Sequence, residues 1–161
     1  MTQSFVTLRA AEPQDEPALR TLWCDTWAAT YPAFDYKVRW PTMWLKWQEL
    51  KAEIYVAARG RDIVGLLVLA PVSEQVLLLE QITLALTEQG SGTAHLLMTI
   101  AKQKTPSLLK LSVNAFNKRA IRFYEREGFV RTASGVNVAL PSTKGRSASM
   151  SARVSCAPPA G

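Results

Sequence analysis

The spacing of hydrophobic and polar residues predicts a strand and then a helix at the start of the chain. Residues 5–9 alternate apolar and polar side chains, which is typical of a strand with one buried face. Leu19, Leu22, Trp23 and Trp27 then recur at helical spacing and would share one face of a helix.

The hydrophobic pattern predicts a further helix and three strands in the rest of the first half of the chain. A second helix is expected from about Pro41, because proline suits a first helical position and residues 43–50 carry an apolar stripe. Three β-rich runs follow at residues 54–58, 63–70 and 76–84, separated by turn-forming residues. Three successive antiparallel strands are therefore predicted.

The second half of the chain alternates between helices and strands. After a glycine-containing loop, the pattern predicts a helix over 93–102, a strand over 108–113, a helix over 118–127 and a strand over 129–132. This order indicates an α+β fold with a strand-helix-strand crossover in its second half.

The composition changes near the C-terminus. From Pro141 onward serine, alanine, proline and glycine dominate without a hydrophobic period, so residues 141–161 are expected to form a low-complexity, disordered tail. Residues 1–140 are then expected to form a single domain. Only residues 136–140 could supply a further strand, so the sheet is expected to lack a regular last strand and to expose an edge.

Composition and charge restrict the class of protein. The 161 residues are 48% hydrophobic, enough for a core without disulfide or metal support. The net charge of +6 is shared between the tail, where Lys144, Arg146 and Arg153 stand without an acid, and the remaining residues. A charge of that size on the domain argues against a nucleic-acid partner.

Cysteine, histidine and hydropathy narrow the class further. With only Cys24, Cys156 and one histidine, neither a disulfide framework nor a bound metal is expected. The longest unbroken apolar runs, residues 54–58 and 66–70, are five residues long, which is too short to cross a membrane. A soluble, cytoplasmic protein without a membrane partner is expected.

A glycine loop at residues 89–94 is the first candidate for chemistry. Glycines before a helix let the backbone approach a ligand, and the successive N–H groups together with the helix start favour a phosphate. A plain turn into a helix is the alternative. A P-loop is excluded because no lysine follows the glycines, and a dinucleotide fingerprint is excluded because several strands precede the loop.

A short helix with clear start and stop signals follows the loop. Asn117 is a good N-cap and Gly128 suits a left-handed C-cap. Asn117, Ala120, Tyr124, Gly128 and Phe129 match the "N..A...Y...GF" segment of the GCN5-related N-acetyltransferase (GNAT) superfamily, which this chain resembles.

The loop supports the same resemblance. Residues 89–94 match the Q/R-x-x-G-x-G/A motif of that superfamily, and the matching order of elements covers about residues 5 to 132. The resemblance implies a GNAT-like mixed, mostly antiparallel twisted sheet flanked by about four helices. It also implies an N-acetyltransferase that moves an acetyl group from acetyl-CoA directly to a primary amine, without a metal.

The resemblance assigns the coenzyme to one set of residues. The backbone N–H groups of the loop would take the pyrophosphate, the strand before the loop would hydrogen-bond the pantetheine, and the following short helix would complete the site. The expected coenzyme-binding residues are Ile82, Thr83, Leu84, Gln89, Gly90, Ser91, Gly92, Thr93, Ala94, Asn117, Ala120 and Phe123.

Two side chains are candidates for acid-base chemistry. Tyr124 matches the general acid of the superfamily, which protonates the departing thiolate, although a tyrosine on the apolar face of a helix also suits a core. Glu80 stands where relatives carry a carboxylate that deprotonates the acceptor, directly or through water, although it could also be a solvated strand residue. On strand parity it would share a face with Val76, Leu78 and Ile82.

The acceptor site is expected where aromatic residues gather. In relatives the first two helices form its wall, which makes Trp27, Tyr31 and Phe34 the candidates for substrate binding, with cation-π contact to an amine. The partner is therefore expected to be a small-molecule or peptide amine, and the protein a monomer or homodimer. A catalytically impaired domain that only binds or responds to acyl-CoA is the second hypothesis.

Overall fold

The computed structural model describes residues 5–30, 32, 34–114, 117–136 and 146–153. Of residues 133–136 and 146–153 it describes the backbone alone. The helices and strands are β1 (Val6–Ala10), a 3-10 turn η1 (Pro13–Asp15), α1 (Glu16–Thr30), α2 (Tyr36–Glu49), β2 (Glu53–Arg59), β3 (Asp62–Pro71), β4 (Val76–Leu84), a 3-10 turn η2 (Leu86–Glu88), α3 (Thr93–Lys104), β5 (Leu108–Asn114), α4 (Lys118–Arg126), β6 (Val130–Val136) and β7 (Arg146–Arg153).

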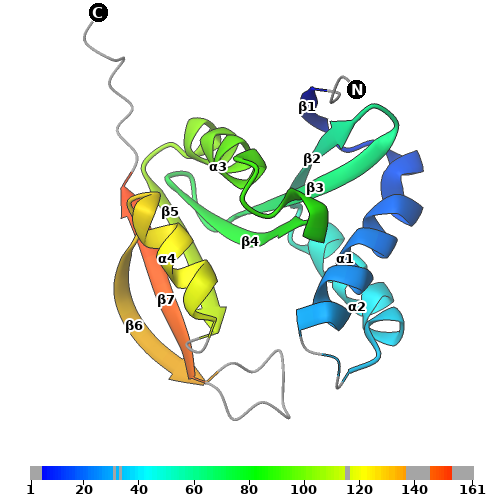
Figure 1. Cartoon of the computed structure of the whole chain (residues 1–161). Coiled ribbons are helices and arrows are strands. Elements are labelled where there is room, and N and C mark those ends of the chain that lie inside the picture. Colours follow the sequence, from blue (N-terminus) through cyan, green and yellow to red (C-terminus); the bar gives the residue numbers. More distant parts are fainter. Residues whose placement is uncertain (1–4, 31, 33, 115–116, 137–145, 154–161) are drawn as a thin grey trace, which may run out of the picture.

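The described strands form one mixed sheet in the order β1-β2-β3-β4-β5-β7-β6 (Figure 1). Its first four strands pair antiparallel in chain order, joined by short connections. β5 is parallel to β4, because α3 carries the chain across one face between them, and β7 lies antiparallel between β5 and β6. The expected α+β class and mostly antiparallel sheet are confirmed.

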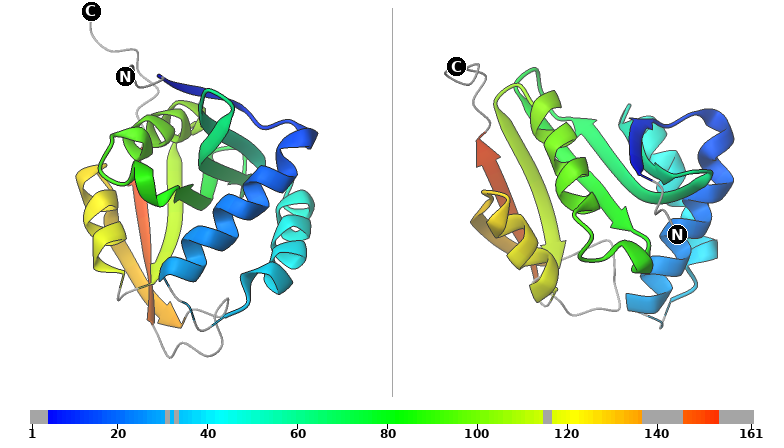
Figure 2. Two further views of the ribbon diagram at one scale, coloured as in Figure 1. Left: turned by 45° about the vertical axis from the view of Figure 1, so that its right-hand side comes forward. Right: turned by 45° about the horizontal axis from the view of Figure 1, so that its top comes forward.

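Helices cover the sheet on both faces, and each face has its own hydrophobic core (Figure 2). α1 and α2 pack with the tryptophan-rich core, in which Trp47 is fully buried against Val56, Leu66 and Val68. α3 and α4 pack on the opposite face against a core that includes Leu67, Leu79 and Leu111 together with Phe129. None of the helices in the described ranges could span a bilayer.

Two neighbouring strands separate in the middle of the sheet. β4 and β5 are paired only from Val76 with Leu108 to Leu79 with Leu111, although β4 continues to Leu84 and β5 to Asn114. At the same point the register between β4 and β3 shifts, because Glu80 is an extra residue between the paired positions 79 and 81. Such a bulge bends its strand, so the sheet opens beyond residue 79.

The second helix begins earlier than the sequence indicates. The carboxylate of Asp35 accepts a hydrogen bond from the Lys37 backbone N–H at 3.1 Å and caps a helix that starts at Tyr36. Pro41 therefore lies inside α2. The prediction that it stands at the first position of the helix is wrong. The helix tolerates the proline because burial of Tyr36, Trp40 and Trp47 stabilises the turns on both sides of it.

The prediction of a tail without structure is wrong for residues 146–153. These residues form β7, whose backbone pairs with β5 on one side and with β6 on the other. The sheet therefore has a regular strand beside β5, and the expected absence of a last strand is corrected. Of residues 136–140, the predicted candidate, Val136 ends β6, and the other four lie outside the described residues.

Candidate active site

A cavity of about 850 Å³ lies where β4 and β5 separate. Its walls come from the last turns of α1, the second half of β4, the loop between η2 and α3, and α4. The predicted site residues in these walls are Trp27, Ile82, Thr83, Leu84, Gln89, Gly90, Gly92, Ala94, Asn117, Ala120, Phe123 and Tyr124. Most of the predicted site therefore comes together around one space.

The glycine loop has a backbone that other residues adopt only with strain. Gly90 has φ +80° and Gly92 has φ +90°, both in the left-handed region. A Cβ added to either glycine would meet no heavy atom within 4 Å, so both positions leave open space beside the backbone. A ligand can thus come into direct contact with the main chain of the loop.

The loop and the first turn of α3 also offer free hydrogen-bond donors. Among the described residues no acceptor is bonded to the backbone N–H groups of Gly90, Gly92, Ala94 and His95. The α3 N-terminus adds a partial positive charge at the same place. Unpaired N–H groups at a helix start are suited to bind phosphate oxygens.

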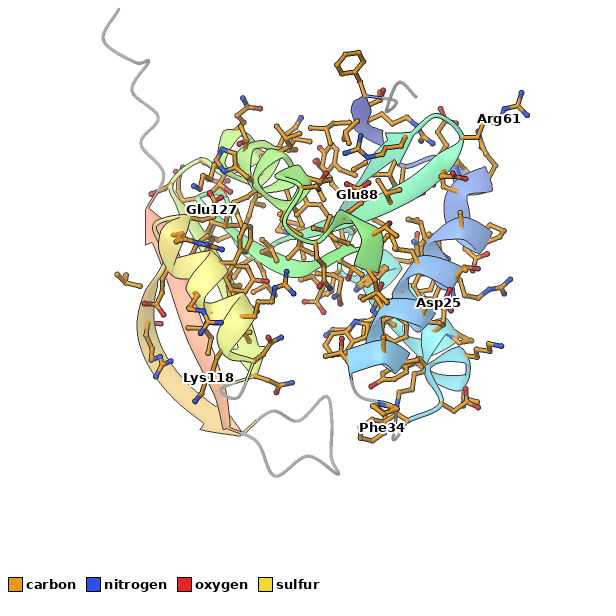
Figure 3. The ribbon with its side chains drawn as sticks, in the orientation of Figure 1. Asp25, Phe34, Arg61, Glu88, Lys118 and Glu127 are labelled. Atoms are coloured by element: carbon orange, nitrogen blue, oxygen red, sulfur yellow. The ribbon has the colours of Figure 1, made fainter. Side chains whose placement is uncertain are left out.

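The buried carboxylate of Glu88 is hydrogen-bonded to side chains of the glycine loop. Glu88 is 5% exposed, and its oxygens accept from Arg59 Nε at 2.5 Å, from Ser91 Oγ at 2.8 Å and from Thr93 Oγ1 at 3.0 Å. The Arg59 hydrogen bond is the main reason that the pKa of Glu88 lies below its usual range, and burial opposes it. Figure 3 shows Glu88 beside the start of α3.

This arrangement gives two residues of the loop a supporting role. The backbone N–H groups of Ser91 and Thr93 were expected to bind the coenzyme, but they already donate to the Glu88 carbonyl at 3.1 Å and to Ser91 Oγ at 3.4 Å. Their hydroxyl groups point to Glu88, and neither residue lines the cavity. They hold the loop in shape from behind it. The sequence pattern does not reveal the role of Glu88. A carboxylate next to a phosphate-binding loop would repel the phosphate, and only the structure shows that Arg59 neutralises it.

Basic side chains surround the loop end of the cavity. Arg119 and Arg126 line it from α4, and Arg119 Nη1 donates to Gln89 Oε1 at 2.7 Å. His95 Nδ1 lies 2.6 Å from Glu127 Oε1. Although burial raises the pKa of Glu127, hydrogen bonds from Lys102 and His95 lower it below its usual range. Figure 3 shows Glu127 beside the end of α4 that lies next to α3.

Tyr124 lies in the cavity wall on the buried face of α4. It is 8% exposed, and its ring packs against Phe123 and Phe129 at centroid distances of 5.4 and 5.7 Å. Burial raises the pKa of its phenol. Within the described part of the chain no group is hydrogen-bonded to its hydroxyl, which leaves Oη available to a ligand.

Glu80 lies at the bulge but not in the cavity wall. Its Oε1 is 2.6 Å from Lys46 Nζ of α2, and its side chain is 11% exposed. It therefore lies on the α2 face of the sheet, whereas Ile82 packs against the core under α3. The expected strand parity is wrong here, because the extra residue at the bulge puts Glu80 and Ile82 on opposite faces.

The predicted acceptor residues have different positions. Trp27 lines the cavity, with its ring 6.4 Å from Trp23 and 6.1 Å from Tyr36. Phe34 is not in the wall: it packs on Tyr36 and has the Arg39 guanidinium 4.5 Å from its ring centroid. Figure 3 shows Phe34 at the end of the helix pair where α1 ends and α2 begins. Tyr31 lies outside the described residues.

Sequence reasoning missed several polar residues of the wall. Thr26 and Thr30 of α1 and Gln81 of β4 face the cavity beside Trp27. A signal existed for the two threonines, because they are one helical turn apart and flank Trp27. Gln81 could not be placed, since its face depends on the bulge. Across the described ranges no group of histidine, cysteine and acidic residues could hold a metal.

Comparison with protein families gives the identity of the fold. The model of the acetyltransferase (GNAT) family matches residues 17–129, which is more than half of the chain. The chain belongs to the GNAT acetyltransferase family. None of the curated proteins matches the chain significantly in sequence.

Solved structures of the GNAT fold agree over nearly the whole chain. The ribosomal-protein-S18-alanine N-acetyltransferase from Escherichia coli is 19% identical, with a TM-score of 0.77 over 97% of this chain and 98% of that one. A protein assigned to the GNAT family from Desulfovibrio desulfuricans is 21% identical, with a TM-score of 0.76 over 94% and 100%.

A third GNAT structure was solved with the coenzyme. This acetyltransferase from Salmonella typhimurium contains its cofactor acetyl-CoA, and it is 16% identical with a TM-score of 0.69 over 97% of this chain and 99% of that one. Identities this low establish a common fold and leave the acceptor open.

Proposed function

We propose that the protein is an N-acetyltransferase that moves an acetyl group from acetyl-CoA directly to a primary amine of a small molecule or peptide. One observation carries the proposal: one cavity joins four backbone N–H groups at a helix N-terminus, unpaired among the described residues, to the C-terminal turn of another helix. The first end suits a phosphate and the second, with Trp27, suits an ammonium group.

The walls of the cavity fit the parts of coenzyme A. The N–H groups of Gly90, Gly92 and Ala94 would bind the pyrophosphate, with Arg119 and Arg126 balancing its charge. The backbone of Ile82, Thr83 and Leu84, which β5 leaves unpaired, would hydrogen-bond the pantetheine. Asn117, Ala120 and Phe123 would close the opposite side. The bound coenzyme would supply the activated acetyl thioester.

Two side chains would move the protons. Glu80 would accept a proton from the acceptor ammonium through a water molecule, because its carboxylate lies at the bulge but outside the cavity wall. Tyr124 would donate a proton from Oη to the departing thiolate sulfur, since its hydroxyl has no hydrogen-bond partner among the described residues and lies at the cavity. Its raised pKa keeps the phenol protonated before that step. A backbone N–H at the bulge would polarise the thioester carbonyl.

A second candidate function is a domain that binds acyl-CoA without turnover. The Glu80–Lys46 ion pair favours it, because a carboxylate already paired with an ammonium group is a poor base for another one. Both functions need the coenzyme site, so they differ only in the transfer step.

Amine-dependent release of the coenzyme thiol distinguishes the two functions. The purified protein is incubated with acetyl-CoA and a panel of small amines and short peptides, and free thiol is followed with a chromogenic disulfide. Release that requires both an amine and Tyr124 supports the acetyltransferase. Coenzyme binding without release from any amine supports the binding domain.

A further inference from the structure

The end of the cavity next to α1 has hydrogen-bonding groups of two kinds on its two walls. Thr26 Oγ1 donates to the Leu84 carbonyl at 3.3 Å, and Thr30 Oγ1 donates to the Thr26 carbonyl at 3.0 Å. Because each hydroxyl hydrogen is used, these threonines present oxygen lone pairs to the cavity. The C-terminal turn of α1 adds a partial negative charge. The α1 wall therefore suits a donor or cation.

The β4 wall has the opposite character. Gln81 Nε2 donates one hydrogen to Thr83 Oγ1 at 2.8 Å, and its second hydrogen has no partner among the described residues. Since Thr83 Oγ1 accepts from Gln81, its own hydrogen is also free within the same ranges. Thr83 is 4% exposed and lines the cavity, so its hydrogen needs an acceptor there. The β4 wall therefore presents two donors.

A buried indole fixes the orientation of the Gln81 amide. Trp23 Nε1 donates to Gln81 Oε1 at 3.4 Å. Trp23 is 3% exposed, and its ring lies 5.6 Å from both Tyr36 and Trp40, so it cannot turn without disturbing the core. The amide nitrogen of Gln81, and not its amide oxygen, is thereby held toward Thr83.

The acidic residues of the cavity wall are already compensated. Glu88 is bonded to Arg59, and Glu127 is bonded to His95 and Lys102. Neither can bind a second cationic group of an acceptor without losing its present partners. A polyamine therefore finds no free carboxylate in the wall formed by the described residues.

From these observations, and resting on the proposed function, we infer that the acceptor is an amine with a carbonyl group on the adjacent carbon, such as an amino-acid amide or a peptide N-terminus. Its amine faces the threonine oxygens and Trp27 of α1, and its carbonyl oxygen accepts from Gln81 Nε2 and Thr83 Oγ1. Gln81 and Thr83 are thus specificity-determining residues.

The test compares two acceptors of equal size and shape. Glycinamide has the carbonyl group and isobutylamine lacks it, and kcat/KM is expressed per concentration of unprotonated amine. The wild type is expected to prefer glycinamide about tenfold or more, because a site with buried donors penalises a ligand that leaves them unpaired. The ratio of the two kcat/KM values is then measured in variants, which cancels intrinsic amine reactivity.

Gln81→Leu and Thr83→Val remove the two donors with little change of shape. Each is expected to lower the selectivity ratio about tenfold while the KM for acetyl-CoA stays unchanged. Thr83→Ser keeps the hydroxyl group and should keep the ratio. Melting curves confirm that each variant is folded, and the two donor variants provide independent tests if one of them fails to fold.

Three results would overturn the inference. Equal efficiency with both amines in the wild type would show that the carbonyl is not recognised, while leaving the acetyltransferase activity intact. An unchanged ratio together with a raised KM for acetyl-CoA in folded Gln81→Leu would show that the amide faces the coenzyme. Transfer to no amine or peptide despite coenzyme binding would instead reject the proposed function itself.

Discussion

Lys46 Nζ of α2 lies 2.6 Å from Glu80 Oε1 at the bulge of β4, so an ammonium group of the protein occupies the carboxylate beside the opening of the sheet. Lys46 is half exposed and Glu80 is largely buried. An acceptor ammonium that approaches from the same face would compete with Lys46 for this carboxylate. The pair therefore separates the two roles that Glu80 could have, as a base or as a structural partner of α2.

Glu80→Gln is expected to lower kcat at least about tenfold with unchanged affinity for acetyl-CoA, because it removes the proton acceptor and keeps the shape. Lys46→Met is the matched control, since it breaks the same ion pair and keeps the carboxylate. Steady-state kinetics of both variants checks the assignment. If the two substitutions lower kcat equally, Glu80 acts through the ion pair and is not the base.

Tyr124→Phe is expected to lower kcat at least about tenfold without weakening coenzyme binding, because only the proton donor to the thiolate is lost. Tyr55→Phe is the control: Tyr55 bonds Glu53 and does not line the cavity. Burial raises the pKa of Tyr124, so its proton should stay in place through the neutral range. No alkaline loss of kcat from this group is therefore expected below about pH 10. Full turnover in the phenylalanine variant would remove Tyr124 from the mechanism.

Glu88→Gln should destabilise the loop in a pH-dependent way. The pKa of Glu88 in the folded protein lies below its ordinary value of 4.5, so its stabilising effect is complete above that pH and is lost as the pH falls through the folded value. At pH 7 the variant should melt roughly 3–10 °C below the wild type. The difference should shrink as the pH falls below 4.5. A difference that is independent of pH would show that the charge of Glu88 contributes nothing.

Truncation tests the role of β7. Ending the chain after residue 140 removes a strand that pairs with both β5 and β6, so cooperative unfolding is expected to be lost. Ending it after Arg153 keeps every described strand and should leave the melting midpoint unchanged. Differential scanning calorimetry of the two truncated proteins measures both effects. An unchanged midpoint in the protein that ends after residue 140 would contradict the assignment of β7 to the sheet.

The sequence was most informative where local chemistry decides the structure. β4 and the starts of α3 and α4 lie where the spacing of apolar residues and caps places them. The left-handed Gly90 and Gly92 agree with a loop that needs glycine. The residues of the cavity wall come largely from these segments, because each segment has its own start and stop signals in the sequence.

Features that depend on pairing could not be read from the sequence. The face on which Glu80 lies is set by a bulge against β3, and one residue of register reverses it. Residues 141–161 as a whole show no hydrophobic period, and only within β7 do Ser147, Ser149 and Ser151 alternate with alanine and methionine. That pattern has little strand propensity by itself, and the backbone partners on both sides supply what it lacks.

The measurement that tests the account most directly is the melting midpoint with and without acetyl-CoA, in the wild type and in Gly92→Asp. At about a hundred times its dissociation constant, a ligand adds about 2.7 kcal/mol, which corresponds to roughly 5–10 °C for a domain of this size. The wild type should show this shift, and Gly92→Asp should not, because its carboxylate would project into the open space beside the loop.

Gly60→Asp is the control, because Gly60 also has a positive φ and open space but lies outside the cavity wall. It should keep the shift. A folded wild-type protein without a shift, or a full shift in Gly92→Asp, would contradict the claim that this loop binds the coenzyme.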